Sequence, residues 1–117
     1  MPHIHLETTA DLVENDRVPD LLAALVEELA RYETVHPASI KAYHTLRATW
    51  AMGAGAKAGF AHCTCMVLSG RPAELRQTIS NGMFAKLTDL FSESVENGEA
   101  GLTLELREMD RDTYRKR

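Results

Sequence analysis

The second residue of the chain is a proline, and its position gives it a chemical role to consider. The sequence begins Met1-Pro2-His3-Ile4, and because initiator methionine is removed before a small residue, we expect Pro2 to become the N-terminus. The nitrogen of an N-terminal proline is a secondary amine, and α-amino groups titrate near ~7.7–8.0. Held rigidly at the start of an apolar strand and partly desolvated, such an amine can act as a general base near pH 7. The alternative is an ordinary proline beside a start codon.

Histidines and cysteines also gather in two places, which raises the question of a metal site. His3 and His5 share one strand face, while His62 stands beside Cys63 and Cys65. Neither spacing matches a closed zinc motif, so we expect no metal. Two cysteines this close on a strand have poor disulfide geometry, and we expect buried thiols rather than nucleophiles. His3 is expected to pack beside the proline or to pair with a carboxylate.

The composition limits the classes of protein that fit the chain. Its 117 residues are 44% hydrophobic and carry a net charge of −4, which favours one globular domain over 1–117 and argues against a nucleic-acid binder. No apolar run approaches the ~18–20 residues of a membrane helix, and no export signal is visible. Together with reduced cysteines, these features predict a cytoplasmic protein. We expect the basic tail, residues 111–117, to be a frayed and solvated end.

Hydrophobic periodicity predicts the elements that must position these residues. Apolar residues at helical spacing begin near Val18 and again after Pro72, and both stripes are expected to face the core. Polar and glycine-containing segments separate the elements. The predicted elements are a strand at 2–8, a loop at 9–17, a helix at 18–33, a strand at 38–50, a strand at 59–68, a helix from Pro72 that ends at Asn97-Gly98, and a strand at 101–106.

The order of these elements is strand, helix, strand, repeated in two half-units of about 1–58 and 59–117. Each βαβ unit has a right-handed crossover, which places both helices on the same sheet face. The predicted fold is therefore α+β, with a four-stranded mixed sheet and two helices on one face. Because a chain this small cannot cover the other face of the sheet, we also expect an oligomer.

Several short motifs, in this order and spacing, resemble a known family. They are Pro2-His3, Leu21-Leu22, Ile40, Thr49-Trp50-Ala51-Met52, Phe60-Ala61-His62-Cys63-Thr64 and Gly70-Arg71-Pro72-Ala73-Glu74-Leu75-Arg76-Gln77. The chain resembles the 5-carboxymethyl-2-hydroxymuconate isomerase family of the tautomerase superfamily nearly from end to end. The resemblance implies a tautomerase-like homotrimer with active sites near subunit boundaries, without metal or organic cofactor.

The same resemblance implies that Pro2 is the catalytic base of a keto–enol tautomerisation. The substrate would be a di- or tricarboxylic dienol from aromatic-ring degradation, similar to 2-hydroxymuconate. The base takes the proton of the 2-hydroxyl group and returns it to a distant carbon. Two alternatives stay open: another proline-based chemistry on this fold, such as dehalogenation or decarboxylation, and a non-catalytic trimeric binding module.

A polyanionic substrate requires cations, and arginine holds carboxylates best because its guanidinium is a planar, bidentate donor. Arg71 precedes a helix N-terminus, which itself favours anions, so we expect it to be a carboxylate clamp. The family carries arginines where this chain has Lys41 and Tyr43. Lys41 is a weaker second clamp, and His3 is the third candidate for substrate binding.

Two charged residues have open roles. Arg47 is a candidate to replace the missing family arginine if its side chain lies on the correct face of its strand. Glu7, in the same strand as Pro2, either orients the amine or faces solvent. These departures leave the identity of the substrate open.

Overall fold

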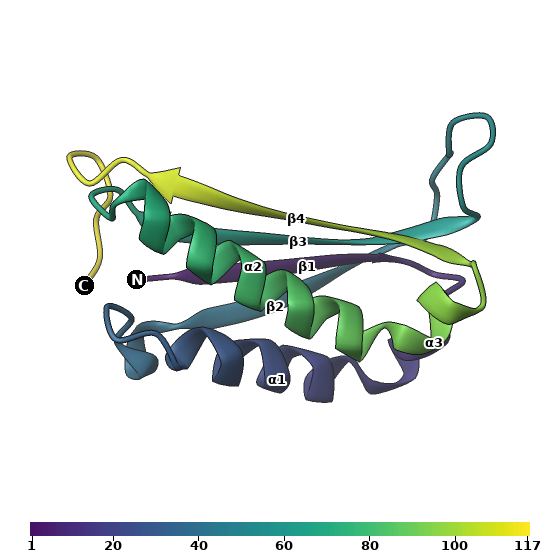
Figure 1. The fold of residues 1–117 in the computed structure, drawn as a ribbon, viewed down its shortest axis with the longest axis horizontal. Helices are drawn as coiled ribbons and strands as arrows, with labels where there is room; N and C mark the ends of the chain where they lie inside the picture. Colours follow the sequence, from purple (N-terminus) through teal and green to yellow (C-terminus); the bar gives the residue numbers. More distant parts are fainter.

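The strand–helix–strand order occurs twice along the chain. The computed structural model describes residues 1–117, and Figure 1 shows the arrangement. The main elements are β1 (His3–Thr9), α1 (Val18–Ala30), β2 (Lys41–Arg47), β3 (Gly59–Leu68), α2 (Ala73–Leu90) and β4 (Ala100–Met109). Three short helices, η1 (Val13–Arg17), η2 (Pro37–Ser39) and α3 (Ser92–Glu96), lie in the connections.

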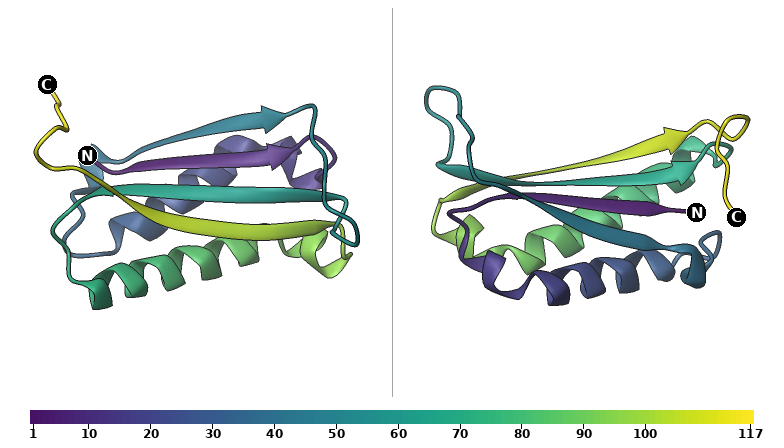
Figure 2. Two further views of the ribbon diagram at one scale, coloured as in Figure 1. Left: turned by 90° about the horizontal axis from the view of Figure 1, so that it is seen from above. Right: turned by 180° about the vertical axis from the view of Figure 1, so that it is seen from behind.

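The four strands form one mixed sheet in the order β2-β1-β3-β4. β1 is parallel to β2 and β3 is parallel to β4, while β1 and β3 are antiparallel. Figures 1 and 2 show α1 and α2 together on one face of this sheet. The predicted α+β fold is therefore confirmed, including the placement of both helices.

This topology brings one end of every strand to the same edge of the sheet. β1 and β2 start there, and β3 and β4 end there, because His3 is opposite Lys41 and Met66, and Met66 is opposite Arg107. In Figure 1 the two chain termini lie close together at this edge. Residues that are far apart in the sequence can therefore meet around Pro2.

The hydrophobic core lies between the sheet and the two helices. Strand alternation directs Ile4 and Leu6 toward the helices, where both are fully buried. Both predicted helical stripes reach this core as well: Leu21, Leu25, Leu29, Ile79, Met83, Leu87 and Phe91 are buried.

The cysteines belong to the same core. Cys63 and Cys65 lie opposite Leu6 and Ile4, are completely buried, and have their sulfur atoms 3.9 Å apart without a disulfide. The prediction of buried thiols is confirmed. The contact with the Cys63 thiol, followed by burial, raises the pKa of Cys65, which keeps it in the unreactive protonated form.

Several predicted boundaries were wrong, including the end of α1, which stops at Ala30 and not at residue 33, and the end of β4, which extends to Met109 and not 106. The strand expected over 38–50 is confined to Lys41–Arg47, because Pro37–Ser39 form η2 and residues 48–58 form a loop that projects beyond the sheet (Figure 1). The second helix is interrupted at Phe91 and continues as α3. The loop expected over 9–17 contains η1.

A buried carboxylate joins two of the short helices. Glu14 of η1 is fully buried and accepts hydrogen bonds from the backbone N–H of Ser94, at 3.0 Å, and from the Ser94 hydroxyl. The first N–H groups of a helix have no partner within the helix. Glu14 therefore caps α3 from a distant part of the chain.

The face of the sheet opposite the helices is polar and carries no helical layer. The Thr45 hydroxyl is hydrogen-bonded to the His5 ring at 2.8 Å, and the Thr103 hydroxyl is hydrogen-bonded to the His62 ring at 2.6 Å. Tyr43 lies beside His5 on this face, with 40% of its surface exposed.

No helix of the protein combines the length and apolar character required to traverse a bilayer.

Candidate active site

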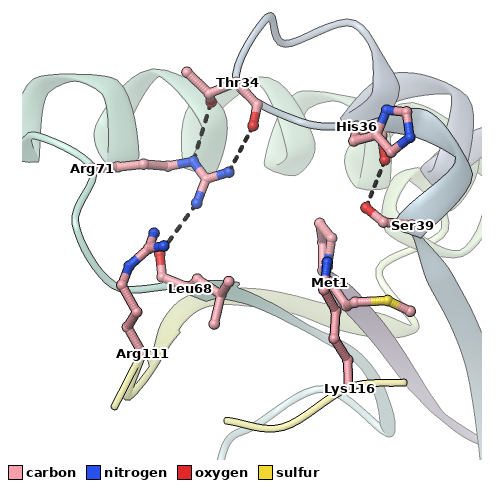
Figure 3. Close-up of a pocket in the computed structure, with 9 residues that line it drawn as sticks. Met1, Thr34, His36, Ser39, Leu68, Arg71, Arg111 and Lys116 are labelled. Atoms are coloured by element: carbon pink, nitrogen blue, oxygen red, sulfur yellow. Dashed lines mark hydrogen bonds between the residues drawn. The ribbon is translucent and has the colours of Figure 1, made fainter.

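A cavity of about 220 Å³ lies at the sheet edge where β1 starts (Figure 3). Its lining comes from five parts of the chain: the N-terminus, the segment before β2, the end of β3, the loop before α2, and the C-terminal tail. The residues that line it are Met1, Pro2, Thr34, His36, Ser39, Leu68, Arg71, Arg111 and Lys116. Two of the residues predicted from the sequence, Pro2 and Arg71, are among them.

Pro2 is held firmly in the wall of this cavity. The residue is buried, and its carbonyl accepts a hydrogen bond from the backbone N–H of Lys41 at 3.0 Å. Met1 precedes it and lines the same cavity. Removal of Met1 would therefore expose the Pro2 nitrogen to the cavity without disturbing the contact that fixes its carbonyl.

Arg71 is presented to the cavity by the turn between β3 and α2. Gly70 has φ = +121°, a conformation that side chains rarely adopt, so glycine is required at this turn. The Arg71 guanidinium donates to the Thr34 hydroxyl at 3.1 Å, to the Thr34 carbonyl at 3.0 Å and to the Leu68 carbonyl at 3.1 Å. Since a guanidinium has five N–H donors, two are left for a ligand. Arg76 supports the turn by donating to the Arg71 carbonyl at 3.2 Å.

Positive charge is concentrated around the start of the chain. Burial lowers the pKa of the Met1 amine below its ordinary value of 8.0, and nearby cations lower the pKa further. These cations are Lys116, Lys41, Arg71 and Arg111. The pKa of Arg71 is itself lowered, first by burial and then by the charge of Arg111.

None of these four cations forms an ion pair, whereas five other arginines of the chain do. A chain with a net charge of −4 therefore has a local excess of unpaired positive charge beside its terminal amine. Such a site attracts anions and keeps an amine in its free-base form.

His3 and Lys41, the other two residues predicted to bind substrate, do not line the cavity. The Nε2 atom of His3 is 2.9 Å from the hydroxyl of Tyr114, a partner different from the expected proline or carboxylate. Lys41 is exposed and its Nζ atom lies 3.5 Å from the sulfur of Met1. His3 therefore contacts the C-terminal tail, and Lys41 contacts Met1, which lines the cavity.

Arg47 and Glu7 lie at the opposite end of β1 from Pro2. Arg47 donates to the Glu7 carboxylate from Nε at 3.0 Å and from Nη2 at 2.5 Å, and these hydrogen bonds lower the pKa of Glu7. Their position argues against a clamp role for Arg47 and against the orienting role, which was one of the two alternatives left open for Glu7. Strand length explains this, because each residue is too far along its strand to reach the cavity edge.

The expectation of a frayed C-terminal tail was also wrong. The backbone N–H and Nε of Arg111 donate to the hydroxyl and carbonyl of Ser69, at 3.2 and 3.0 Å. The N–H of Tyr114 donates to the carbonyl of Asp110 at 3.0 Å. The tail thus folds back over the edge of the sheet and supplies Arg111 and Lys116 to the cavity.

Five polar lining residues were absent from the sequence prediction: Thr34, His36, Ser39, Arg111 and Lys116. The strand order, which was not predicted from the sequence, is the signal that would have found them. Because β3 and β4 run antiparallel to β1, both end at the sheet edge where β1 starts, and the parallel β2 begins at that edge. The segments that precede β2 and follow β4 therefore had to border Pro2.

The family comparison matches almost the whole chain. The sequence model described as 5-carboxymethyl-2-hydroxymuconate isomerase matches residues 2–117, so the match begins at Pro2. No curated protein sequence matches the chain.

Comparison with solved structures identifies similar folds. A 5-carboxymethyl-2-hydroxymuconate isomerase from Deinococcus radiodurans R1 has 28% identity and a TM-score of 0.89, with 99% of this chain and 88% of that chain covered. A 5-carboxymethyl-2-hydroxymuconate delta-isomerase has 13% identity and a TM-score of 0.85, with 100% and 87% covered. A fused 4-OT described as a symmetric trimer has 16% identity and a TM-score of 0.70, with 93% and 86% covered.

Proposed function

The chain belongs to the 5-carboxymethyl-2-hydroxymuconate isomerase family and is an isomerase of the tautomerase superfamily, and we propose that Pro2 is its general base. In this proposal Met1 is removed and the Pro2 nitrogen becomes a free secondary amine. The substrate is a 2-hydroxymuconate-like dienol with two or three carboxylates. The reaction is a keto–enol tautomerisation that uses the protein's own side chains and no cofactor.

One observation carries the proposal: Pro2 lines a cavity together with cations that have no carboxylate partner. The cations favour the free amine, which is the form that can accept a proton. They also offer a binding site to the carboxylates of the substrate. A base and an anion site in one cavity are the two requirements of this reaction.

In the proposed reaction, the Pro2 nitrogen takes the proton from the 2-hydroxyl group of the dienol. The electron pair of the O–H bond forms the C=O bond, the double bonds shift along the chain, and a distant carbon becomes nucleophilic. The protonated Pro2 returns its proton to that carbon. Negative charge that develops on the 2-oxygen is stabilised by the cationic donors around the cavity.

Arg71 is the proposed carboxylate clamp, since three hydrogen bonds fix its guanidinium and leave two donors free. Lys41 remains a proposed second, weaker cation near the entrance, because it reaches Met1 but lacks the planar fork of arginine. We propose His3 as an indirect contributor through Tyr114.

The proposed assembly is a homotrimer. The fused 4-OT structures with TM-scores of 0.70 and 0.75 are described as trimers. The polar sheet face that no helix covers in this chain is the surface that other subunits would cover.

An ultraviolet assay tests the proposed reaction. The protein, shown by intact mass to begin at Pro2, is incubated with 2-hydroxymuconate and with its carboxymethyl analogue. We expect the dienol absorbance to decay in proportion to enzyme concentration. Two further compounds test the alternative chemistries: a halogenated acrylate, with dehalogenation measured as halide release, and a β-keto acid, with decarboxylation measured as carbon dioxide release. Turnover of the acrylate or the keto acid without turnover of either dienol would replace the tautomerase proposal. Turnover of no compound would favour a binding module.

A further inference from the structure

We infer that the C-terminal tail, residues 110–117, is a second carboxylate-binding element that gives this site a preference for dicarboxylates. Arg111 would join Arg71 in holding one carboxylate, and Lys116 would receive the other. The inference deepens the proposed function and rests on it for the identity of the bound compound as a substrate. The binding site itself can be tested without turnover.

The contacts of Arg111 leave the end of its side chain available to a ligand. Its Nε donates to the Ser69 carbonyl at 3.0 Å and its backbone N–H donates to the Ser69 hydroxyl at 3.2 Å. Neither of its two terminal nitrogens has a hydrogen-bond partner or a carboxylate within ion-pair distance. The side chain is thus fixed at its stem and open at the fork that binds carboxylates.

Arg71 and Arg111 lie on one side of the cavity, and Lys116 lies on the other beside Met1 (Figure 3). The two guanidiniums repel each other, which is why Arg111 lowers the pKa of Arg71. A carboxylate between them would offset this repulsion. Charge on both sides of the cavity suits a linear compound with a carboxylate at each end.

A hydrogen bond at the start of β1 ties the tail in this position. The hydroxyl of Tyr114 lies 2.9 Å from Nε2 of His3, and the two rings meet edge to face at 6.1 Å. Within the tail, the carbonyl of Asp110 accepts from the N–H groups of Thr113 and Tyr114, at 3.2 and 3.0 Å. His3 follows Pro2 directly, so the tail is held to the strand that carries the proposed base. Tyr114 is therefore a positioning residue for Arg111 and Lys116.

Two six-carbon acids that lack the 2-hydroxyl group provide unreactive probes. Trans,trans-muconate carries a carboxylate at both ends, and sorbate carries a methyl group in place of one of them. Isothermal titration calorimetry on the chain that begins at Pro2 measures both affinities. We expect the intact protein to bind muconate more tightly than sorbate. Equal affinities would overturn the inference.

Charge-removing variants locate the preference in the tail. Arg111→Gln and Lys116→Gln should each lower the affinity for muconate about 10- to 100-fold, the range of a charge-assisted hydrogen bond. Arg115→Gln is the matched control, because Arg115 lies in the same tail but donates only to backbone carbonyls of Asp112 and Tyr114. An unchanged affinity in Arg111→Gln, or an equal loss in Arg115→Gln, would overturn the inference.

Tyr114→Phe tests the positioning role, since it removes the hydroxyl and keeps the ring. We expect the ratio of muconate affinity to sorbate affinity to fall, and an unchanged ratio would contradict the role.

Failure of these tests is distinguishable from failure of the proposed function. If 2-hydroxymuconate is not turned over but muconate binds in an Arg111-dependent way, the tail site stands and the reaction does not. If 2-hydroxymuconate is turned over but muconate binding does not depend on Arg111, the reaction stands and the tail site does not.

Discussion

The chemistry proposed for Pro2 depends on the charge of its surroundings. An amine exposed to water near neutral pH is largely protonated, because its ordinary pKa is close to 8. At the start of this chain, burial and four unpaired cations lower the pKa of the terminal amine. The same cations would act on the Pro2 nitrogen once Met1 is removed. The proposed base and the proposed anion-binding residues therefore depend on one electrostatic arrangement.

This arrangement predicts how activity changes with pH. A base with a lowered pKa is active at lower pH, so kcat/KM should rise with pH, and the midpoint of the rise should lie below the ordinary pKa of an α-amino group. Lys116→Gln removes the first of the cations that lower the amine pKa, so the midpoint of the rising limb should move to higher pH. The pH profile of kcat/KM measures this, because it reports the free enzyme.

Lys86→Gln is the matched control for the pH profile. It removes the same charge from α2, outside the cavity that contains Pro2. Its midpoint should equal that of the unmodified protein. A shift to lower pH in Lys116→Gln, or equal shifts in both variants, would contradict the electrostatic account.

Local sequence patterns predict only some of the residues that line this cavity. Pro2 and Arg71, which both line the cavity, could be selected from the sequence because each stands beside a local feature, a chain start and a helix start. Arg111 and Lys116 were missed because a short basic tail is typical of a solvated end. Their position depends on where β4 ends in the sheet and on hydrogen bonds to Ser69 and His3, and neither follows from the composition of the tail.

At the scale of elements, periodicity predicts where helices and strands exist better than where they stop. The leucine stripe of α1 and the apolar stripe of α2 both face the core as expected. The end of β2 and the break between α2 and α3 depend on tertiary contacts. One of these is the capping of α3 by Glu14, which lies 80 residues away in sequence.

This cap predicts a stability effect. Glu14→Ala leaves the buried N–H and hydroxyl of Ser94 without their acceptor, which costs about 1–3 kcal/mol. We expect the free energy of unfolding, from chemical denaturation, to fall by that amount. Asp16→Ala is the control, since Asp16 belongs to the same η1 helix but pairs with Arg17 at the surface. Equal unfolding free energies for the two variants would show that the cap contributes nothing.

At the scale of the whole molecule, the two faces of the sheet have different surroundings. One face is covered by α1 and α2 (Figure 2). The other face presents Tyr43, histidines and threonines. A tautomerase-like trimer would cover this second face. Sequence pattern predicts the open face, because two βαβ units place both helices on the same side.

The trimer predicts a particle of three times the chain mass of 13.0 kDa in sedimentation equilibrium. Tyr43→Glu places a charge on the uncovered face and should shift the mass toward the monomer. Phe84→Glu is a closely matched control, because Phe84 is 41% exposed and Tyr43 is 40% exposed, but Phe84 belongs to the helical layer. A monomeric unmodified protein, or equal dissociation in both variants, would contradict the assembly.

The central claim is that the amine of Pro2 is the base. The most direct test compares the rate of 2-hydroxymuconate tautomerisation by the chain that begins at Pro2 with the rate of the same chain that retains Met1, in which the Pro2 nitrogen is an amide without basicity. Because general-base catalysis contributes about 10²- to 10⁴-fold, kcat/KM should be lower by at least about 100-fold in the chain that retains Met1. Equal rates for the two chains would contradict the claim.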